Sequence, residues 1–126
     1  MIEALFNQPN YIVANKALDA VVLREKAIAN NIANLETPGY KRIDLAPNFE
    51  AELERASATG DLQQIKTLNP TLAVDTTAVS SSRDGNTVHL ENELMQMNQN
   101  AMTHAFETQL ISGMLSRLQM AITGKT

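Results

Sequence analysis

Apolar side chains recur with an alternating four- and three-residue spacing along two long stretches of the chain. The first stripe contains Ala14, Leu18, Val21, Ile28, Ile32 and Leu35, with Glu25 as its polar member. The second contains Leu90, Leu94, Met97, Ala101, Ile111, Leu115, Leu118 and Ile122, and is interrupted by His104 and Thr108. Because this spacing follows one face of an α-helix, it predicts amphipathic helices over residues 10–35 and 90–123.

Each predicted helix carries an apolar stripe about two residues wide per heptad, which one helix alone cannot bury. The obvious partner of each stripe is the other helix. With 126 residues, the chain has enough material for a single modest core. We therefore predict one mainly α unit over residues 1–126, in which the two long helices pair as a coiled-coil-like hairpin around an irregular middle.

The middle region, residues 36–89, has a different pattern. Residues 40–45 alternate like a short extended segment, and residues 47–58 form a candidate short helix with Phe49 and Leu53 on one side. Residues 76–86 are rich in Ser, Thr and an Asp-Gly pair, which is typical of a loop with little to bury. We expect that loop to be mobile in an isolated subunit.

Charge and composition exclude several functions. Ten basic against fourteen acidic residues give a net charge of −4, which disfavours binding to nucleic acid. The absence of Cys rules out thiolate catalysis, and no apolar run is long enough to span a membrane. The N-terminal residues lack the basic and apolar regions of a classical signal peptide.

No residue pattern indicates catalysis, a metal or a cofactor. Asp84 and Gly85, followed by Glu91, resemble the second half of a calcium loop, but Ser80 and Ser82 stand where carboxylate ligands are needed. The serines also lack a nucleophile-elbow pattern. We therefore predict that the protein is not an enzyme and has no small-molecule substrate.

The segment NNIANLETPGYKR, residues 30–42, ends the first helix in an unusual way. Asn30, Asn31 and Asn34 are weak helix formers that place amides where backbone carbonyls lose their partners. Residues 37–40, Thr-Pro-Gly-Tyr, suit a type II turn, with Gly39 at the position that requires a positive φ. The pattern leaves open whether the amides bond within one subunit or to the next.

This segment also carries a family resemblance. Asn31 to Asn34 followed by Thr37, Pro38, Gly39, Tyr40 and Lys41 resembles the N-terminal signature of bacterial flagellar rod, hook and related axial proteins. Asp84, Gly85 and Asn86, then Val88, Leu90 and Glu93, resemble the second signature, although Thr87 and His89 depart from it. The chain leaves no room for the inserted domains of hook and distal-rod relatives, so it is most similar to the short subunits of the proximal rod, of which more than one kind is a candidate.

The resemblance implies a structural subunit that assembles into a tube, with its long helices in the core and the middle region outside. The implied partners are copies of itself, other flagellar rod proteins, an adaptor and the inner-membrane ring at the rod base, and the flagellar export apparatus. The implied location is the periplasmic rod of the basal body, reached without a cleavable signal peptide. The apolar stripes would supply contacts within and between subunits, and Asn31, Asn34, Pro38, Gly39 and Tyr40 would shape the turn from core to outer layer.

A second class of function fits the same stripes. A soluble helical adaptor or chaperone would use them to bind a client and would fold completely on its own. A rod subunit is expected instead to have frayed helix ends when purified, because its stripes lack their neighbours.

Overall fold

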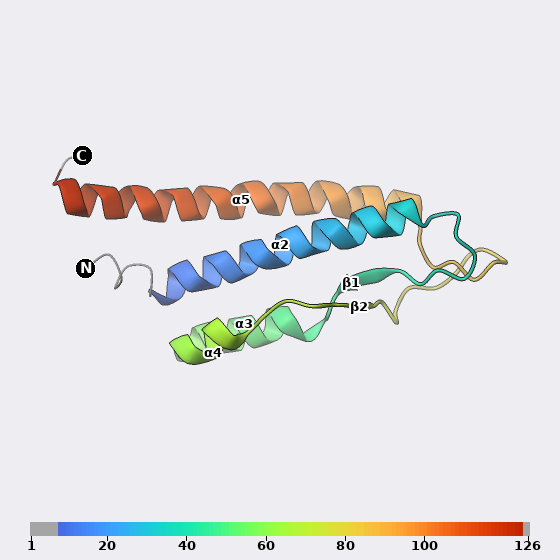
Figure 1. Cartoon of the computed structure of the whole chain (residues 1–126), viewed down its shortest axis with the longest axis horizontal. Coiled ribbons are helices and arrows are strands. Elements are labelled where there is room, and N and C mark those ends of the chain that lie inside the picture. The colour runs from blue at the N-terminus through green and yellow to red at the C-terminus, as the bar shows by residue number, and fades with distance from the viewer. Residues whose placement is uncertain (1–7, 125–126) are drawn as a thin grey trace.

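The chain is arranged in layers around its N-terminal helix. The computed structural model describes residues 8–124, so the predicted unit 1–126 and the signal-peptide expectation extend outside this range. The elements are α2 (Pro9–Ala33), β1 (Ile43–Leu45), α3 (Asn48–Thr59), α4 (Leu62–Thr67), β2 (Leu72–Val74) and α5 (Leu90–Thr123). Helix α2 lies between α5 on one side and the layer of α3, α4 and the two strands on the other (Figure 1). The predicted fold class, two long helices with an irregular middle, is confirmed.

Helix α2 begins and ends close to the predicted bounds. Pro9 occupies the first turn, where its missing N–H costs nothing, so the helix starts one residue earlier than predicted. It ends at Ala33 because Asn34 has left helical geometry, with φ −105° and ψ 19°. The predicted end at Leu35 is therefore two residues too late.

The main hydrophobic core lies between α2 and the middle region. It contains Ile12, Ala20, Leu45, Phe49, Leu53, Ala56 and Ile65. The candidate short helix is confirmed as α3, and its predicted apolar side is buried in this core. The middle region thus supplies apolar partner surface for α2, in addition to the other long helix predicted as its partner.

The extended segment predicted over residues 40–45 is a strand for three residues only. β1 pairs antiparallel with β2, in the register Ile43 with Val74 and Leu45 with Leu72. Two further backbone bonds continue the ladder, from Ala46 to Thr71 and from Asp75 to Arg42, each 2.8 Å long. A two-stranded sheet is only marginally stable alone, so its contact with α2 is what holds it.

Helix α5 turns a polar face toward α2, which corrects the prediction that its apolar stripe fills this interface. Its buried side chains are Glu93 and Asn100, seven residues apart and therefore on one face. Five members of the predicted stripe are 41–52% exposed: Leu90, Leu94, Met97, Leu115 and Ile122. Ile111 and Leu118 are half-buried. The physical reason is that Glu93 and Asn100 form hydrogen bonds with α2, to Asn31 and to the Val21 carbonyl. These bonds set the rotation of α5 about its axis, so that most of the apolar stripe faces to the side of α2.

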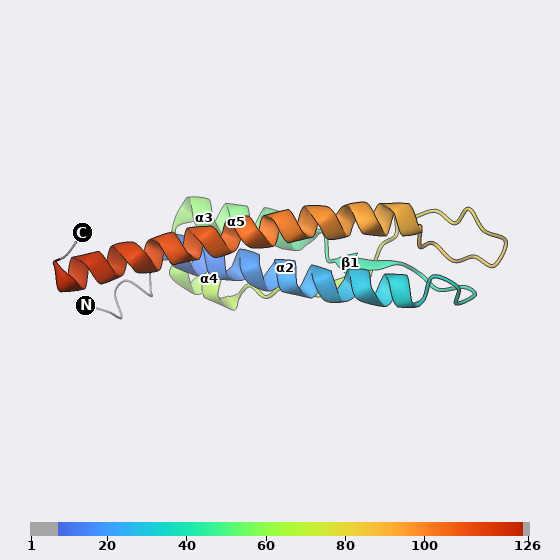
Figure 2. The same ribbon diagram turned by 90° about the horizontal axis from the view of Figure 1, so that it is seen from above.

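On α2 the predicted stripe is better covered. Val21 and Ile28 are buried, whereas Leu18, Ile32 and Leu35 are half-buried. Figure 2 shows that α5 extends past the start of α2, so its last turns lack this neighbour. Among residues 8–124, no helix combines the length and apolarity needed to span a membrane.

Candidate functional site

The two sequence motifs meet where α2 ends and α5 begins. We call residues 30–42 the turn motif and residues 84–93 the second motif. In Figure 1 both lie at the end of the molecule where the chain leaves α2 and enters α5. Hydrogen bonds between them join segments that are about fifty residues apart in sequence.

Asn86 of the second motif caps the end of α2. Its Nδ2 group donates to the carbonyls of Asn34, Leu35 and Thr37 over 2.9, 3.0 and 2.8 Å. Its Oδ1 accepts from the Val88 N–H at 2.8 Å, and the side chain is buried. Carbonyls at a helix end have no intrahelical donor. The Asn86 amide of the second motif therefore supplies the donor for three carbonyls of the turn motif.

The turn motif forms a type II-like reversal that is tied to the second motif. Gly39 has φ +73°, and the Tyr40 N–H donates to the Thr37 carbonyl at 3.3 Å. The Gly39 N–H donates to the Asp84 carbonyl at 2.8 Å. Lys41 Nζ, which is exposed, reaches the Gly85 carbonyl at 3.0 Å. Thr37 and Pro38 are exposed; Pro38 contributes through its restricted backbone, whereas the Thr37 hydroxyl also donates to Asn34 Oδ1.

Valine at position 39 should destabilise this turn. A β-branched residue is strongly disfavoured at a positive φ, so we expect Gly39→Val to lower the free energy of unfolding by about 1–3 kcal/mol. Urea denaturation followed by circular dichroism would measure it. Gly113→Val is the matched control because Gly113 lies in α5 with open space around it and no positive φ. Equal effects of the two substitutions would show that the geometry at position 39 does not matter.

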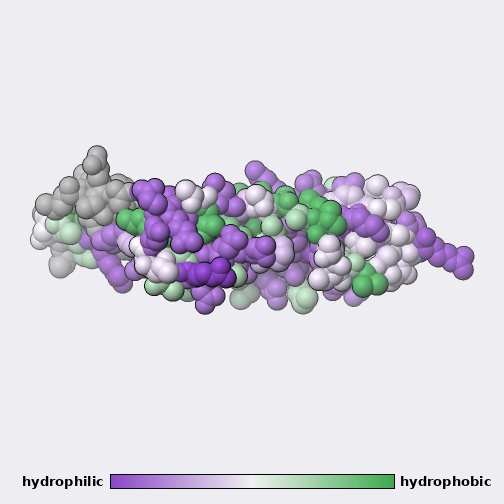
Figure 3. Space-filling view, turned by 90° about the horizontal axis from the view of Figure 1, so that it is seen from below, coloured by the Kyte–Doolittle hydropathy of each residue, from purple (hydrophilic) through white to green (hydrophobic). Residues whose placement is uncertain are grey.

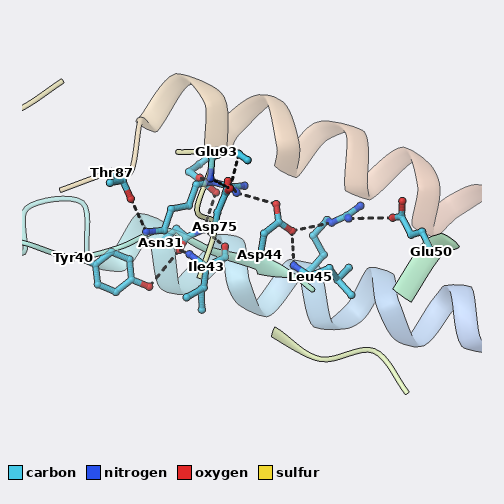
Figure 4. A network of polar contacts seen from close by, with 12 residues as sticks. Asn31, Tyr40, Ile43, Asp44, Leu45, Glu50, Asp75, Thr87 and Glu93 are labelled. Carbon is cyan, nitrogen blue, oxygen red and sulfur yellow. Dashed lines mark hydrogen bonds and ion pairs between the residues drawn. The ribbon is translucent and has the colours of Figure 1, made fainter. Parts of the chain in front are cut away.

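The Asn31 side chain is fully buried and bonds to the backbone of β1 as an adjacent strand would. Its Oδ1 accepts from the Ile43 N–H at 3.0 Å, and its Nδ2 donates to the Ile43 carbonyl at 2.8 Å. The same amide also contacts Glu93 Oε2 at 3.2 Å and the Tyr40 hydroxyl at 3.3 Å (Figure 4). The Asn31 side chain therefore joins α2, β1 and α5 within one chain.

The other two asparagines have smaller roles. Asn34 Nδ2 donates to the Asn30 carbonyl at 2.8 Å, and its Oδ1 accepts from the Thr37 hydroxyl at 3.1 Å. Asn30 is exposed. The amides of Asn31 and Asn34 thus bond within the subunit, which answers the question that the sequence left open.

Arg42 is the centre of a buried ion-pair network that our reading of the sequence missed. Its guanidinium pairs with Glu93 and with Asp44 and Asp75, over 2.9 and 2.8 Å for the two aspartates. Its backbone N–H donates to the Thr87 hydroxyl at 2.8 Å. Glu93 has no exposed surface. In Figure 4 the labelled acidic side chains Glu93, Asp75 and Asp44 lie near one another between the start of α5 and strand β1.

The electrostatics of the network follow from this geometry. Burial alone would lower the pKa of Arg42, but the hydrogen bonds and charges of Glu93 and Asp44 raise it above its ordinary value. The pKa of Asp75 is lowered, first by the Thr77 hydroxyl and also by Arg42. Both directions favour the charged forms. The network therefore holds the first turn of α5, through Glu93, against the segment that contains Arg42 and β1.

Asn100 makes the second polar contact between the long helices. Its Nδ2 donates to the Val21 carbonyl at 2.9 Å, while its buried Oδ1 has no hydrogen-bond partner within residues 8–124. An unpaired buried acceptor is uncommon in native proteins. Asn100 Oδ1 is therefore a buried acceptor that no group among residues 8–124 pairs.

We expect Glu107, which lies on α5 beside α2, to make the stability of the fold depend on pH. Burial raises the pKa of this half-buried carboxyl group above its ordinary 4.5. A raised carboxyl pKa means that the native state binds the proton more tightly, so stability falls as pH rises from about 4.5 through the folded pKa. We expect Glu107→Gln to raise the free energy of unfolding at pH 7 by roughly a few tenths of a kcal/mol and to have no effect below pH 4. Urea titrations at both pH values, with exposed Glu52→Gln as the control, would detect it; a pH-independent difference would contradict it.

The buried charges of the junction are paired with one another. Within residues 8–124 no three His, Cys, Asp or Glu side chains are grouped to hold a metal ion. What the arrangement can do is fix the angle at which the chain leaves α2 and enters α5.

Known proteins resemble this chain in sequence. A family model described as "Flagella basal body rod protein" matches residues 13–41, which cover most of α2 and the turn motif. The flagellar basal body rod protein FlgB of Cereibacter sphaeroides is 36% identical over 117 residues, covering 84% of this chain and 90% of the relative. FlgB of Borrelia hermsii is 35% identical over 115 residues (78% and 84%), and FlgB of Bacillus subtilis is 27% identical over 118 residues (86% and 88%). The chain therefore belongs to the FlgB family of flagellar basal body rod proteins.

Proposed function

We infer that this chain is a structural subunit of the proximal rod of the flagellar basal body. Its similarity to FlgB proteins over most of its length supports this function. One observation in the structure carries it further. Helix α5 exposes apolar side chains from Leu90 to Ile122. An extended apolar surface on a folded protein marks an interaction site.

The distribution of apolar surface supports assembly through the long helices. The face formed by α3, α4 and the strands is mostly hydrophilic, with apolar side chains only in small separate groups (Figure 3). By contrast, ten of the exposed large apolar residues lie on α5. A subunit with a polar outer layer and an apolar helix on its other side is suited to packing into the wall of a tube, with α5 inward.

In this assembly the junction of the two motifs has a defined task. It fixes the turn from α2 to the outer layer and sets the direction of α5 before any neighbour is bound. We propose that Asn31, Asn86, Gly39, Tyr40 and the Arg42–Glu93 pair shape the subunit, and that the exposed stripe of α5 contacts other subunits.

The partners follow from the location. Membership of the family supports contact with other flagellar rod proteins. We further propose an adaptor and the inner-membrane ring at the rod base as neighbours, and export through the flagellar export apparatus to the periplasmic rod without a cleavable signal. We propose no catalytic activity and no cofactor.

Location in purified basal bodies tests this function. An epitope-tagged chain is expressed in a host whose own gene for this protein is deleted, and basal bodies are isolated. We expect restored swimming and the tag in the rod fraction. Restored swimming with the tag only in the cytoplasm would favour an adaptor or chaperone and would contradict a rod subunit.

A further inference from the structure

Strand β2 has one edge that the rest of the chain leaves open. The register and the two backbone bonds at the ends of the β1–β2 ladder show that residues 71, 73 and 75 direct their backbone groups toward β1. Leu72 and Val74 alternate with these residues, so their N–H and C=O groups point away from β1. None of these four groups has a hydrogen-bond partner within residues 8–124. They form an unpaired row along the outer edge of the sheet.

The opposite edge of the sheet is closed by side chains. Ile43 and Leu45 are the residues of β1 whose backbone groups point away from β2. Asn31 on α2 pairs with both backbone groups of Ile43, and Asp44 Oδ1 accepts from the Leu45 N–H at 2.7 Å. In Figure 1, β2 lies on the side of β1 away from α2. The described part of the chain therefore satisfies the hydrogen bonds of one sheet edge and not those of the other.

The open edge also lacks the usual protection against strand pairing. Proteins commonly place lysine, proline or a β-bulge on an exposed edge, because its free backbone groups can pair with another extended chain. β2 consists of Leu72, Ala73 and Val74, and its register with β1 runs without a bulge. Ala73 is exposed, and Val74 is 53% exposed. The edge is therefore accessible and suited to the addition of a further strand.

The two faces of the sheet differ in chemistry, and this difference defines the segment that fits. Side chains alternate across a strand, so Leu72 and Val74 share an apolar face with their partners on β1. Ala73 lies on the other face, opposite Asp44 in the register. On that face the Arg42 network continues through Arg24 and joins two guanidinium groups to four carboxylates: Arg24, Arg42, Asp44, Glu50, Asp75 and Glu93. Two positive against four negative charges leave an excess of two negative charges.

We propose that the open edge of β2 binds an extended segment of another protein in which apolar residues alternate with lysine or arginine. The backbone of the segment pairs with Leu72 and Val74. Its apolar side chains lie beside Val74, and its basic side chains lie on the face with the negative excess. β2 itself contains no basic residue, so the same strand of a second copy does not meet this requirement.

The small size of the edge indicates how the partner is held. A strand of three residues offers far less than the roughly 800 Å² that each partner contributes to a stable interface. An isolated segment should therefore bind weakly, with a Kd on the order of 1 mM, and its parent protein is held nearby by further contacts. Because β2 lies in the outer layer and not on α5, the proposal does not depend on the proposed rod function.

An NMR titration of the full-length chain, labelled with nitrogen-15, tests the site. The probe is a short peptide, blocked at both ends, in which valine alternates with lysine; the control peptide has glutamate in place of lysine. We expect the lysine peptide to shift the amide signals of Leu72 and Val74 and to slow their hydrogen exchange. The glutamate peptide should bind at least about tenfold more weakly, because its carboxylates meet the negative excess.

Substitutions at Val74 test whether the backbone of the edge is the binding group. Val74→Pro removes an N–H that points outward and leaves the bonds of residues 71, 73 and 75 to β1 in place. It should abolish binding of the lysine peptide. Val74→Thr is the matched control, since it keeps the N–H and the branched shape, and it should bind like the wild type. If the lysine peptide shifts no β2 signal at millimolar concentration, or binds Val74→Pro normally, the proposal is wrong.

A change of charge beside the edge gives an independent test that leaves the backbone donors intact. Ala73 is exposed on the face with the negative excess, so Ala73→Lys adds a positive charge where the basic side chains of the segment lie. We expect this variant to bind the lysine peptide more weakly and the glutamate peptide more strongly than the wild type does. An unchanged preference between the two peptides would contradict the proposed basic partner.

Discussion

Replacing Arg42 by methionine should lower the free energy of unfolding by about 3–5 kcal/mol, the cost of breaking a buried ion pair from one side. Methionine fills much of the same space but cannot neutralise Glu93, which has no exposed surface. Asp44 and Asp75 would lose their shared cation at the same time. Urea denaturation of the full-length chain, followed by circular dichroism, would measure the loss.

Lys41→Met is the matched control for this substitution. Lys41 is the neighbouring basic residue and makes one exposed hydrogen bond, to the Gly85 carbonyl. Its replacement should cost less than about 1 kcal/mol. If the two substitutions have similar effects, the Arg42 network does not hold α5 in place.

Asn31→Ala should have the next largest effect, a loss of about 2–4 kcal/mol. The substitution removes both partners of the Ile43 backbone groups and opens a cavity in a fully buried position. Thermal and urea unfolding would both report it. We also expect faster hydrogen exchange at Ile43, whose N–H loses its acceptor.

Asn30→Ala separates this specific role from the general effect of asparagine in a helix. Asn30 is the preceding residue in α2 but is exposed. Alanine is the better helix former, so Asn30→Ala should be neutral or slightly stabilising. A loss at position 30 as large as that at position 31 would contradict the assignment of the amide contacts.

Local patterns were sufficient to predict the long helices, α3 and the turn at Gly39. Each depends on periodicity or on residues that restrict φ within a few positions of one another. The same reasoning missed α4 and β2. Asp61 does accept from the Gln63 and Gln64 N–H groups as a helix N-cap, but six residues give too little periodicity to reveal α4. β2 is a strand only because β1 and α2 lie beside it.

The centre of the junction could not be predicted because its partners are far apart in sequence. Arg42 and Glu93 are separated by 51 residues, and nothing local distinguishes Arg42 from exposed Lys41 beside it. The orientation of α5 about its axis was predicted wrongly for a related reason. Apolar periodicity led us to place Leu94 and Met97 toward α2, whereas the partners of buried Glu93 and Asn100 decide which face turns inward.

The central claim is that the chain fixes its own junction but leaves the far part of α5 for its neighbours. Hydrogen exchange of the purified full-length chain, read by mass spectrometry, tests this most directly. We expect strong protection in α2 and in α5 from Leu90 to about Asn100, and weak protection from about Leu110 to Thr123, where few side chains are covered. Uniformly strong protection of both helices through Thr123 would indicate a self-contained bundle, as expected of an adaptor, and would contradict the claim.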